Sequence, residues 1–173
     1  MLVSVSLSFT ACPLQRQNKL KFDKLERSTF EDAMKDTNIE YSSIDELILT
    51  NASYIESHLG EGVSGGVIGE LNDVVFSYVE YVDTYFAHEY FKQHFMEYDY
   101  YYTTDHDREI NLLIEDDMGY ALFDFDMSSV QIYGGIYFKD NVIIMVSNAN
   151  SKHKYSDEAL IDSFLDKIGY PKP

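Results

Sequence analysis

The feature that most restricts the fold of this chain is a series of four β-rich stretches in its C-terminal half, joined by very short links. The stretches are rich in β-branched and aromatic residues and cover residues 109–115, 119–126, 129–138 and 141–148. The links contain turn-forming residues and cover 116–119, 126–129 and 139–141. Such short links allow antiparallel hairpins but not the long crossover that parallel strands need. The C-terminal half therefore predicts an antiparallel meander.

One further strand and three helices are predicted ahead of the meander, and a fourth helix is predicted after it. The strand is Val74–Val82, and its predicted inner face contains Val75, Ser77, Val79 and Tyr81. The helices begin with the capping residues Ser28, Ser43, Asp83 and Ser156 and end near Thr37, Gly60, Tyr98 and Gly169. For the second helix, a strand over Glu46–Thr50 is the competing interpretation.

This order of elements predicts an α+β fold, in which an antiparallel sheet of about five strands is packed by three to four helices. The chain has 173 residues and shows no internal repeat, so we expect a single acidic domain over residues 28–173. Because 45% of the residues are hydrophobic, the chain has enough apolar surface to form a core.

The charge of the chain is strongly acidic and uneven. The formal net charge is -17, from 30 acidic and 13 basic residues, which repels a phosphate backbone and argues against a nucleic-acid partner. Residues 1–27 are basic overall, whereas no Lys or Arg occurs between Asp36 and Glu89. Carboxylates in that long stretch must find cationic partners elsewhere in the chain.

The single cysteine, Cys12, follows an uncharged apolar run that is too short to span a membrane as a helix. The run suits the apolar part of a signal peptide, and Phe9-Thr10-Ala11-Cys12 resembles a bacterial lipobox. This resemblance implies that residues 1–11 are a signal-peptide remnant and that Cys12 is lipidated. Residues 12–27 would then form a basic tether, and the protein would be anchored to the outer side of the cell membrane. The alternatives are a buried N-terminal strand with Cys12 in the core, and an ordinary flexible linker.

The layout of the remaining chain also carries a resemblance. A capped first helix, a long amphipathic helix after a strand, a meander, and a last helix ending near Ile168-Gly169-Tyr170 resemble small uncharacterised lipoproteins of Gram-positive bacteria. The resemblance concerns the order of helices and strands over residues 28–170, and it implies no catalytic residues.

Motifs for catalysis, cofactors or metals are weak. Gly60, Gly62 and Gly65 form a literal G-x-G-x-x-G, but the motif follows a helical pattern and precedes a strand, which favours a flexible loop over a nucleotide site. The run Asp105-His106-Asp107 lacks the spacing of a calcium loop and is interpreted as a solvated acidic loop. No nucleophile motif is present, so we expect a protein without enzymatic activity, cofactor or metal.

Tyrosine is abundant, with 15 residues against no tryptophan. A cluster after the long helix contains Tyr98, Tyr100, Tyr101 and Tyr102. Tyrosine suits protein or glycan recognition, and it also suits packing at a sheet edge, so both interpretations stay open.

Two functions follow from these features. The first is a lipid-anchored, non-enzymatic binding or envelope-associated lipoprotein whose ligand the sequence does not identify. The second is a cytoplasmic acidic inhibitor, such as an immunity-type protein or a nucleic-acid mimic. The fate of residues 1–11 separates them, since only the inhibitor would retain them as folded structure.

Overall fold

The computed structural model describes residues 20–103, 111–127, 130–151 and 154–173, with side chains described outside 95–103, 125–131 and 149–156. Within these residues, four helices and seven strands follow one another along the chain. In order, they are α1 (Arg27–Asp36), β1 (Tyr41–Ser43), α2 (Ile44–Leu59), β2 (Val63–Leu71), β3 (Val74–Tyr81), α3 (Thr84–Thr103), β4 (Asn111–Ile114), β5 (Met118–Met127), β6 (Val130–Lys139), β7 (Val142–Ser151) and α4 (Lys154–Ile168).

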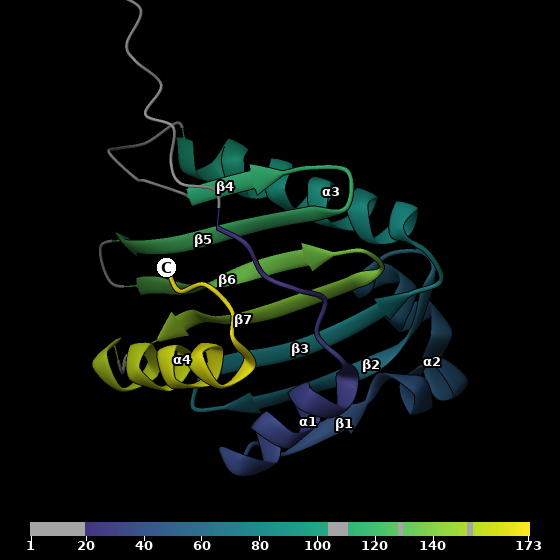
Figure 1. Cartoon of the computed structure of the whole chain (residues 1–173), viewed down its shortest axis with the longest axis horizontal. Helices are drawn as coiled ribbons and strands as arrows, with labels where there is room; N and C mark the ends of the chain where they lie inside the picture. Colours follow the sequence, from purple (N-terminus) through teal and green to yellow (C-terminus); the bar gives the residue numbers. More distant parts are fainter. Residues whose placement is uncertain (1–19, 104–110, 128–129, 152–153) are drawn as a thin grey trace, which may run out of the picture.

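The described strands form one sheet in the order β1-β2-β3-β7-β6-β5-β4, and every neighbouring pair is antiparallel (Figure 1). The α+β class, the antiparallel sheet and the C-terminal meander are therefore confirmed. The sheet has seven strands where about five were expected, because the sequence interpretation did not include β1 and β2.

Glycines explain why β2 was interpreted as a loop. Gly66 has a φ of +138°, and a Cβ there would overlap the carbonyl oxygen of Tyr78 on the neighbouring strand. Only glycine allows the two backbones to approach in this conformation. The expected flexible connection from Gly60 to Gly69 is thus wrong for its larger part, which lies in β2.

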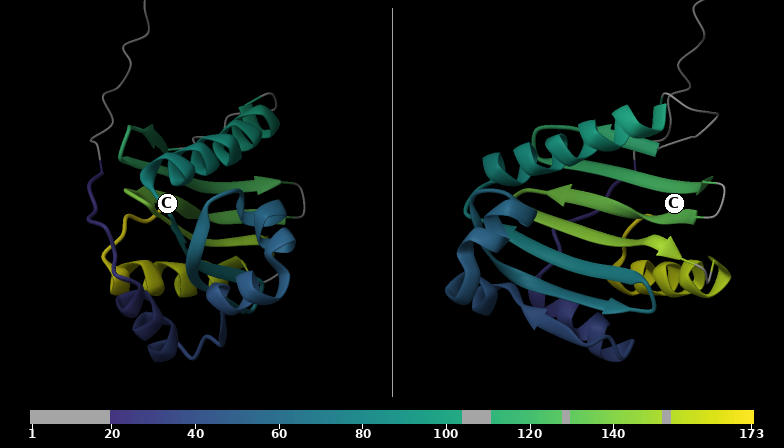
Figure 2. Two further views of the ribbon diagram at one scale, coloured as in Figure 1. Left: turned by 90° about the vertical axis from the view of Figure 1, so that its right-hand side faces the viewer. Right: turned by 180° about the vertical axis from the view of Figure 1, so that it is seen from behind.

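Helices cover both faces of the sheet (Figures 1 and 2). On one face, α1, α4 and the N-terminal segment 20–26 pack on a core that includes Phe76 and Tyr78 of β3. On the other face, α2 and α3 pack on a second core that includes Val79 and Tyr81 of the same strand. The prediction of a single inner face for β3 is therefore wrong, because this strand is buried on both sides.

The four predicted helices are confirmed, with differences at their ends. The α4 helix begins at Lys154, before the expected start at Ser156. The α1 helix begins at Arg27 after its N-cap residue Glu26, so Ser28 is not the cap. The α2 region is helical, so the competing strand over Glu46–Thr50 is wrong. Asp83 caps α3 as expected by accepting a hydrogen bond of 3.2 Å from the backbone N–H of Phe86. However, α3 continues to Thr103, well beyond the expected end at Tyr98.

The N-terminal segment from Leu20 to Glu26 belongs to the folded body. Phe22 is 7% exposed and lies 4.7 Å, between ring centroids, from Tyr170 near the C-terminus. Leu25 is also buried, and the backbone carbonyl of Asp23 accepts a hydrogen bond of 3.0 Å from the hydroxyl of Tyr170. The predicted tether over residues 12–27 is therefore wrong for its described part, which packs against the sheet.

Arg27 supplies the ion pairs that the acidic stretch lacks. Its guanidinium lies 2.6 Å from Asp45 at the start of α2 and 4.0 Å from Glu80 in β3. The Asp45 carboxylate also accepts a hydrogen bond of 3.1 Å from the Ser43 hydroxyl. The expectation that these carboxylates need partners from outside their own stretch is confirmed at this point.

Candidate binding surface

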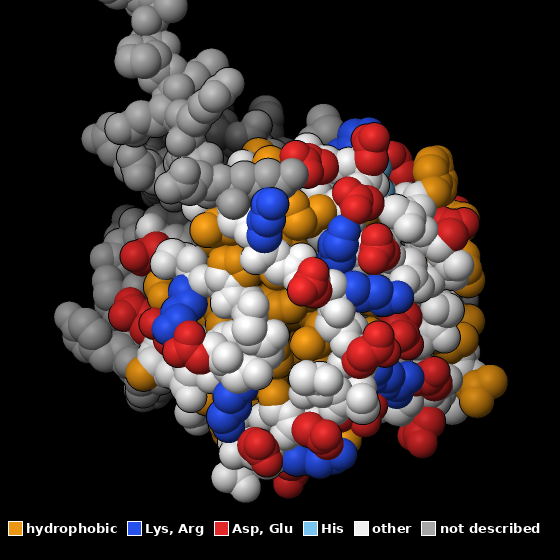
Figure 3. Space-filling view, in the orientation of Figure 1, with side chains coloured by type: hydrophobic (Ala, Val, Ile, Leu, Met, Phe, Trp, Pro, Cys, Tyr) orange, Lys and Arg blue, Asp and Glu red, His pale blue; other side chains and the backbone are white. Residues whose placement is uncertain are grey.

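The acidic stretch is a long part of the fold that carries no basic residue, and we call the surface that it contributes the acidic side. It contains eleven Asp and Glu residues, no Lys and no Arg over residues 36–91. These residues build β1, α2, β2, β3 and the first turns of α3. On the opposite face of the sheet, lysines and arginines lie among the carboxylates over the N-terminal segment, α1 and α4 (Figure 3). Lysine and arginine are therefore absent from β1, α2, β2 and β3, although Arg27 of α1 reaches Asp45 and Glu80 of this stretch.

A pocket of about 360 Å³ lies between the C-terminal end of α2 and the start of α3. We call it the α2–α3 pocket. Its walls are formed by Glu56, Gly60, Glu61, Tyr85, Phe86, Glu89, Tyr90 and Gln93. The lining therefore combines three carboxylates with three aromatic rings.

Two glycines allow the turn after α2 to approach the aromatic rings of α3. Gly60 and Gly62 have φ values of +80° and +78°, which favour glycine. A Cβ at Gly60 would lie 2.9 Å from the ring of Tyr90, and one at Gly62 would overlap the ring of Phe86. The two glycines of the G-x-G pair thus serve a close contact with α3.

Tyrosine hydroxyls hold the end of α2 against α3. The Tyr90 hydroxyl donates a hydrogen bond of 3.1 Å to the carbonyl oxygen of His58. The buried Tyr81 hydroxyl donates a bond of 2.7 Å to the carbonyl oxygen of Leu59. Burial raises the pKa of Tyr81 well above its ordinary value, so this hydroxyl keeps its proton at physiological pH. Both bonds engage carbonyls at a helix end, where the helix leaves them without an internal partner.

The mouth of the pocket exposes aromatic and acidic groups together. Tyr85 is 65% exposed and its ring meets Phe86 edge to face at 5.5 Å between centroids. The Glu89 carboxylate lies 3.3 Å from the Lys92 ammonium nitrogen, in an ion pair. Among the described residues, no ion pair involves Glu56 or Glu61. The pocket therefore carries negative charge that the described part of the protein does not neutralise.

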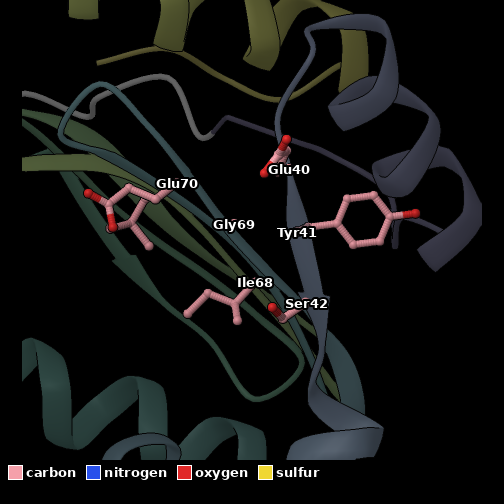
Figure 4. A pocket seen from close by; sticks show the side chains of 7 residues that line it. Glu40, Tyr41, Ser42, Ile68, Gly69 and Glu70 are labelled. Carbon is pink, nitrogen blue, oxygen red and sulfur yellow. The ribbon is translucent and has the colours of Figure 1, made fainter.

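A second hollow of about 500 Å³, the β1–β2 groove, lies beside the edge strand β1 (Figure 4). It is lined by Glu40, Tyr41, Ser42, Ile68, Gly69, Glu70 and Val75. In the close view, the carboxylates of Glu40 and Glu70 lie toward one end, and the Ile68 and Ser42 side chains lie toward the other. The Tyr41 ring points to the opposite side of the strand, where it packs against the core beneath α1. This groove is therefore acidic and aliphatic, without an aromatic ring directed into it.

The site residues predicted from the sequence fall mostly outside what the structure describes. Cys12 and the Asp105–Asp107 run lie outside the described residues. Tyr98, Tyr100, Tyr101 and Tyr102 are part of α3 itself and do not follow it, and their side chains are outside the described set. The aromatic binding surface expected at these positions therefore stays a prediction.

Sequence reasoning missed the α2–α3 pocket, although a signal for it exists. Tyr85, Glu89 and Gln93 are four residues apart and thus share one side of α3, next to the apolar stripe that faces the sheet. This side mixes a large aromatic residue with polar residues. Such a mixture beside a core-facing stripe is a signal for a binding surface.

No group of three or more His, Cys, Asp and Glu side chains in the described part of the chain is arranged to hold a metal ion. Among the same residues, no helix has the length and apolarity needed to cross a membrane.

No protein-family model matches its sequence, and no curated protein matches it.

Proposed function

We propose that this chain is a non-enzymatic binding protein that uses its acidic side to engage a positively charged partner. The observation that carries the proposal is the uneven distribution of charge along the chain, with eleven carboxylates and no Lys or Arg over residues 36–91. A surface of one sign attracts partners of the opposite sign and accelerates their association. Two hollows in this region, the α2–α3 pocket and the β1–β2 groove, are both lined by glutamates.

The proposed setting is the outer side of a bacterial membrane, with a lipid on Cys12 as the anchor. Support comes from the lipobox-like residues Phe9–Cys12. Seven residues separate Cys12 from Leu20, the first described residue, and they span at most about 25 Å when extended. The N-terminal segment packs on the opposite face of the sheet from α2 and α3. In this arrangement, the acidic side would stay free for a partner while the body remains close to the membrane.

A soluble inhibitor of a basic protein is the second candidate, and the packing of the N-terminal segment favours it. Phe22 and Leu25 are buried, so less of the chain is left for a tether than the lipoprotein interpretation expects. An acidic inhibitor would use the same surface, since a nucleic-acid-binding target presents a basic site. Membrane fractionation of the native protein separates the two settings.

The binding proposal is tested with fluorescein-labelled octalysine and measured by fluorescence anisotropy at several salt concentrations. We expect saturable binding that weakens as salt is raised, because exposed charges are screened. The triple variant Glu56→Gln, Glu61→Gln, Glu70→Gln should bind about tenfold more weakly, since each exposed charge contributes about 0.2 to 1 kcal/mol.

A matched triple variant controls for net charge. Asp23→Asn, Asp116→Asn and Asp124→Asn together remove the same number of charges from exposed positions outside residues 36–91. This control should change octalysine affinity by less than about twofold, because its sites lie away from the acidic side. Equal losses in both triple variants would show attraction by net charge alone and would contradict a defined surface.

A further inference from the structure

We propose that the α2–α3 pocket binds the cationic side chain of a single lysine or arginine on the partner polypeptide. This inference rests on the proposed function and specifies where the partner's charge is recognised. It concerns the pocket lined by Tyr85, Phe86 and Tyr90 with Glu56, Glu61 and Glu89.

The aromatic rings of the pocket can attract a cation. A lysine or arginine placed over a tyrosine face is attracted by the negative face of the ring. Tyr85 is 65% exposed, and the Tyr90 ring is fixed by the hydrogen bond of its hydroxyl to His58 and by packing against the His94 ring at 4.2 Å between centroids. A cation entering the pocket would therefore meet one accessible ring and one ring that is already positioned. Prior positioning reduces the entropy cost of binding.

The carboxylates of the pocket supply the negative charge that a cation needs. Glu56 comes from α2, Glu61 from the turn after it, and Glu89 from α3, so negative charge reaches the pocket from three segments. Arg27 contacts Asp45 and Glu80, and Lys92 contacts Glu89. Within the described residues, Glu56 and Glu61 remain without an ion pair. A cation from another molecule would supply the missing charge.

The size of the pocket also fits one long side chain. A volume of about 360 Å³ lies at the lower end of the range for ligand sites, about 300 to 1,000 Å³. This volume suits one long side chain better than a large cofactor. The aliphatic stem of lysine or arginine can cover the exposed ring surface while its charged end reaches the glutamates. The β1–β2 groove offers carboxylates without an inward-facing ring, which makes it the weaker cation site.

The test compares two short peptides that differ only in charge. Acetyl-Gly-Lys-Gly-amide and acetyl-Gly-norleucine-Gly-amide are titrated into the full-length ¹⁵N-labelled protein, and amide shifts are followed by NMR. We expect saturable shifts at residues 56–62 and 85–93 with the lysine peptide and at least fivefold weaker binding of the norleucine peptide. Equal affinity of the two peptides would overturn the proposal.

Variants of the pocket separate ring and charge. Tyr85→Leu keeps an apolar side chain but removes the ring, and Glu61→Gln removes one charge. Each should weaken the lysine peptide about two- to fivefold, the range for an exposed cation–π contact or ion pair. Val82→Ala is the matched control, because Val82 is 63% exposed near the start of α3 but does not line the pocket. Unchanged affinity in Tyr85→Leu would contradict the role of the ring.

Failure of this inference can be distinguished from failure of the proposed function. If octalysine binding depends on the acidic side while the lysine peptide shifts other residues, the pocket assignment is wrong and the proposed function stands. If octalysine does not bind, both are wrong.

Discussion

Replacing Phe22 by alanine tests whether the N-terminal segment is part of the folded body. The Phe22 ring is 7% exposed and lies 5.7 Å from Tyr137 and 6.4 Å from Tyr120 of the sheet, between ring centroids. It also contacts Tyr170 beyond α4 at 4.7 Å. One side chain thus joins the N-terminal segment, two strands and the C-terminal residues.

The expected cost follows from these contacts. Removing a buried phenylalanine ring usually costs about 3 to 5 kcal/mol in the free energy of unfolding. Phe22 lies in a segment without helix or strand structure, and this segment can move partly into the space left behind. We therefore expect a loss in the free energy of unfolding at the lower end of this range, about 3 kcal/mol. For a protein of this size, that corresponds to a decrease in Tm of roughly 6 to 12 °C.

Urea unfolding followed by circular dichroism measures this change on the full-length chain. Leu49→Ala is the control, because Leu49 is 86% exposed and its removal should cost less than about 0.5 kcal/mol. A chain that begins at Leu25 should lose at least as much stability as Phe22→Ala, because it lacks the same contacts. If Phe22→Ala unfolds like Leu49→Ala, residues 20–26 are a tether after all, and the packing argument is refuted.

Three further predictions concern the Arg27 contacts, a strained glycine and the anchor. Desolvation raises the pKa of Asp45, but hydrogen bonds from Arg27, Ser43 and the Gly66 N–H outweigh it and leave the pKa below its usual value. The stabilisation from this carboxylate is therefore present above about pH 4 and lost as pH falls through the lowered pKa. Arg27→Met should lower Tm by about 2 to 4 °C at pH 7 and by less at pH 2.5. Equal differences at the two pH values would exclude Asp45 as the cause. Gly134→Ala places a Cβ against the carbonyl oxygen of Val146, whereas Gly169→Ala, also at positive φ, meets no atom within 4 Å. By chemical denaturation, Gly169→Ala should cost about 1 kcal/mol and Gly134→Ala several times more, so similar costs would contradict the steric argument. Cys12→Ala should release the protein from membranes at any salt concentration without changing Tm, and a soluble native protein would favour the inhibitor.

The meander and the last helix were predictable because their signals are local. Short turns fix antiparallel neighbours, and Ile161, Phe164, Leu165 and Ile168 of α4 are buried as their spacing predicts. By contrast, β2 contains Gly65, Gly66 and Gly69, which weaken a strand signal in isolation. Tertiary contacts explain why glycine is needed in this strand. A Cβ at Gly69 would lie 2.6 Å from Met34 of α1 and 2.5 Å from the Glu40 carbonyl oxygen. No local pattern contains those contacts.

The candidate site was harder to predict than the fold for a similar reason. Its walls come from α2, the following turn and α3, and the glutamates of a chain this acidic are not distinctive one by one. What distinguishes Glu56 and Glu61 is their position beside Tyr85 and Phe86, which depends on Gly60 and Gly62. The uneven distribution of Lys and Arg was visible in the sequence, but the hollows on that side were not.

The pairing of β3 with β7 has a consequence for how the chain folds. The β2–β3 hairpin closes through Asn72 and Asp73, both at positive φ as a tight two-residue turn requires, and it can form from local contacts alone. The β3–β7 ladder instead joins residues more than 60 positions apart, which raises the contact order of the fold. We therefore expect the two halves of the sheet to form first and to join last. Until they join, β3 and β7 each present an open hydrogen-bonding edge, and these edges are where a partly folded chain would pair with another copy.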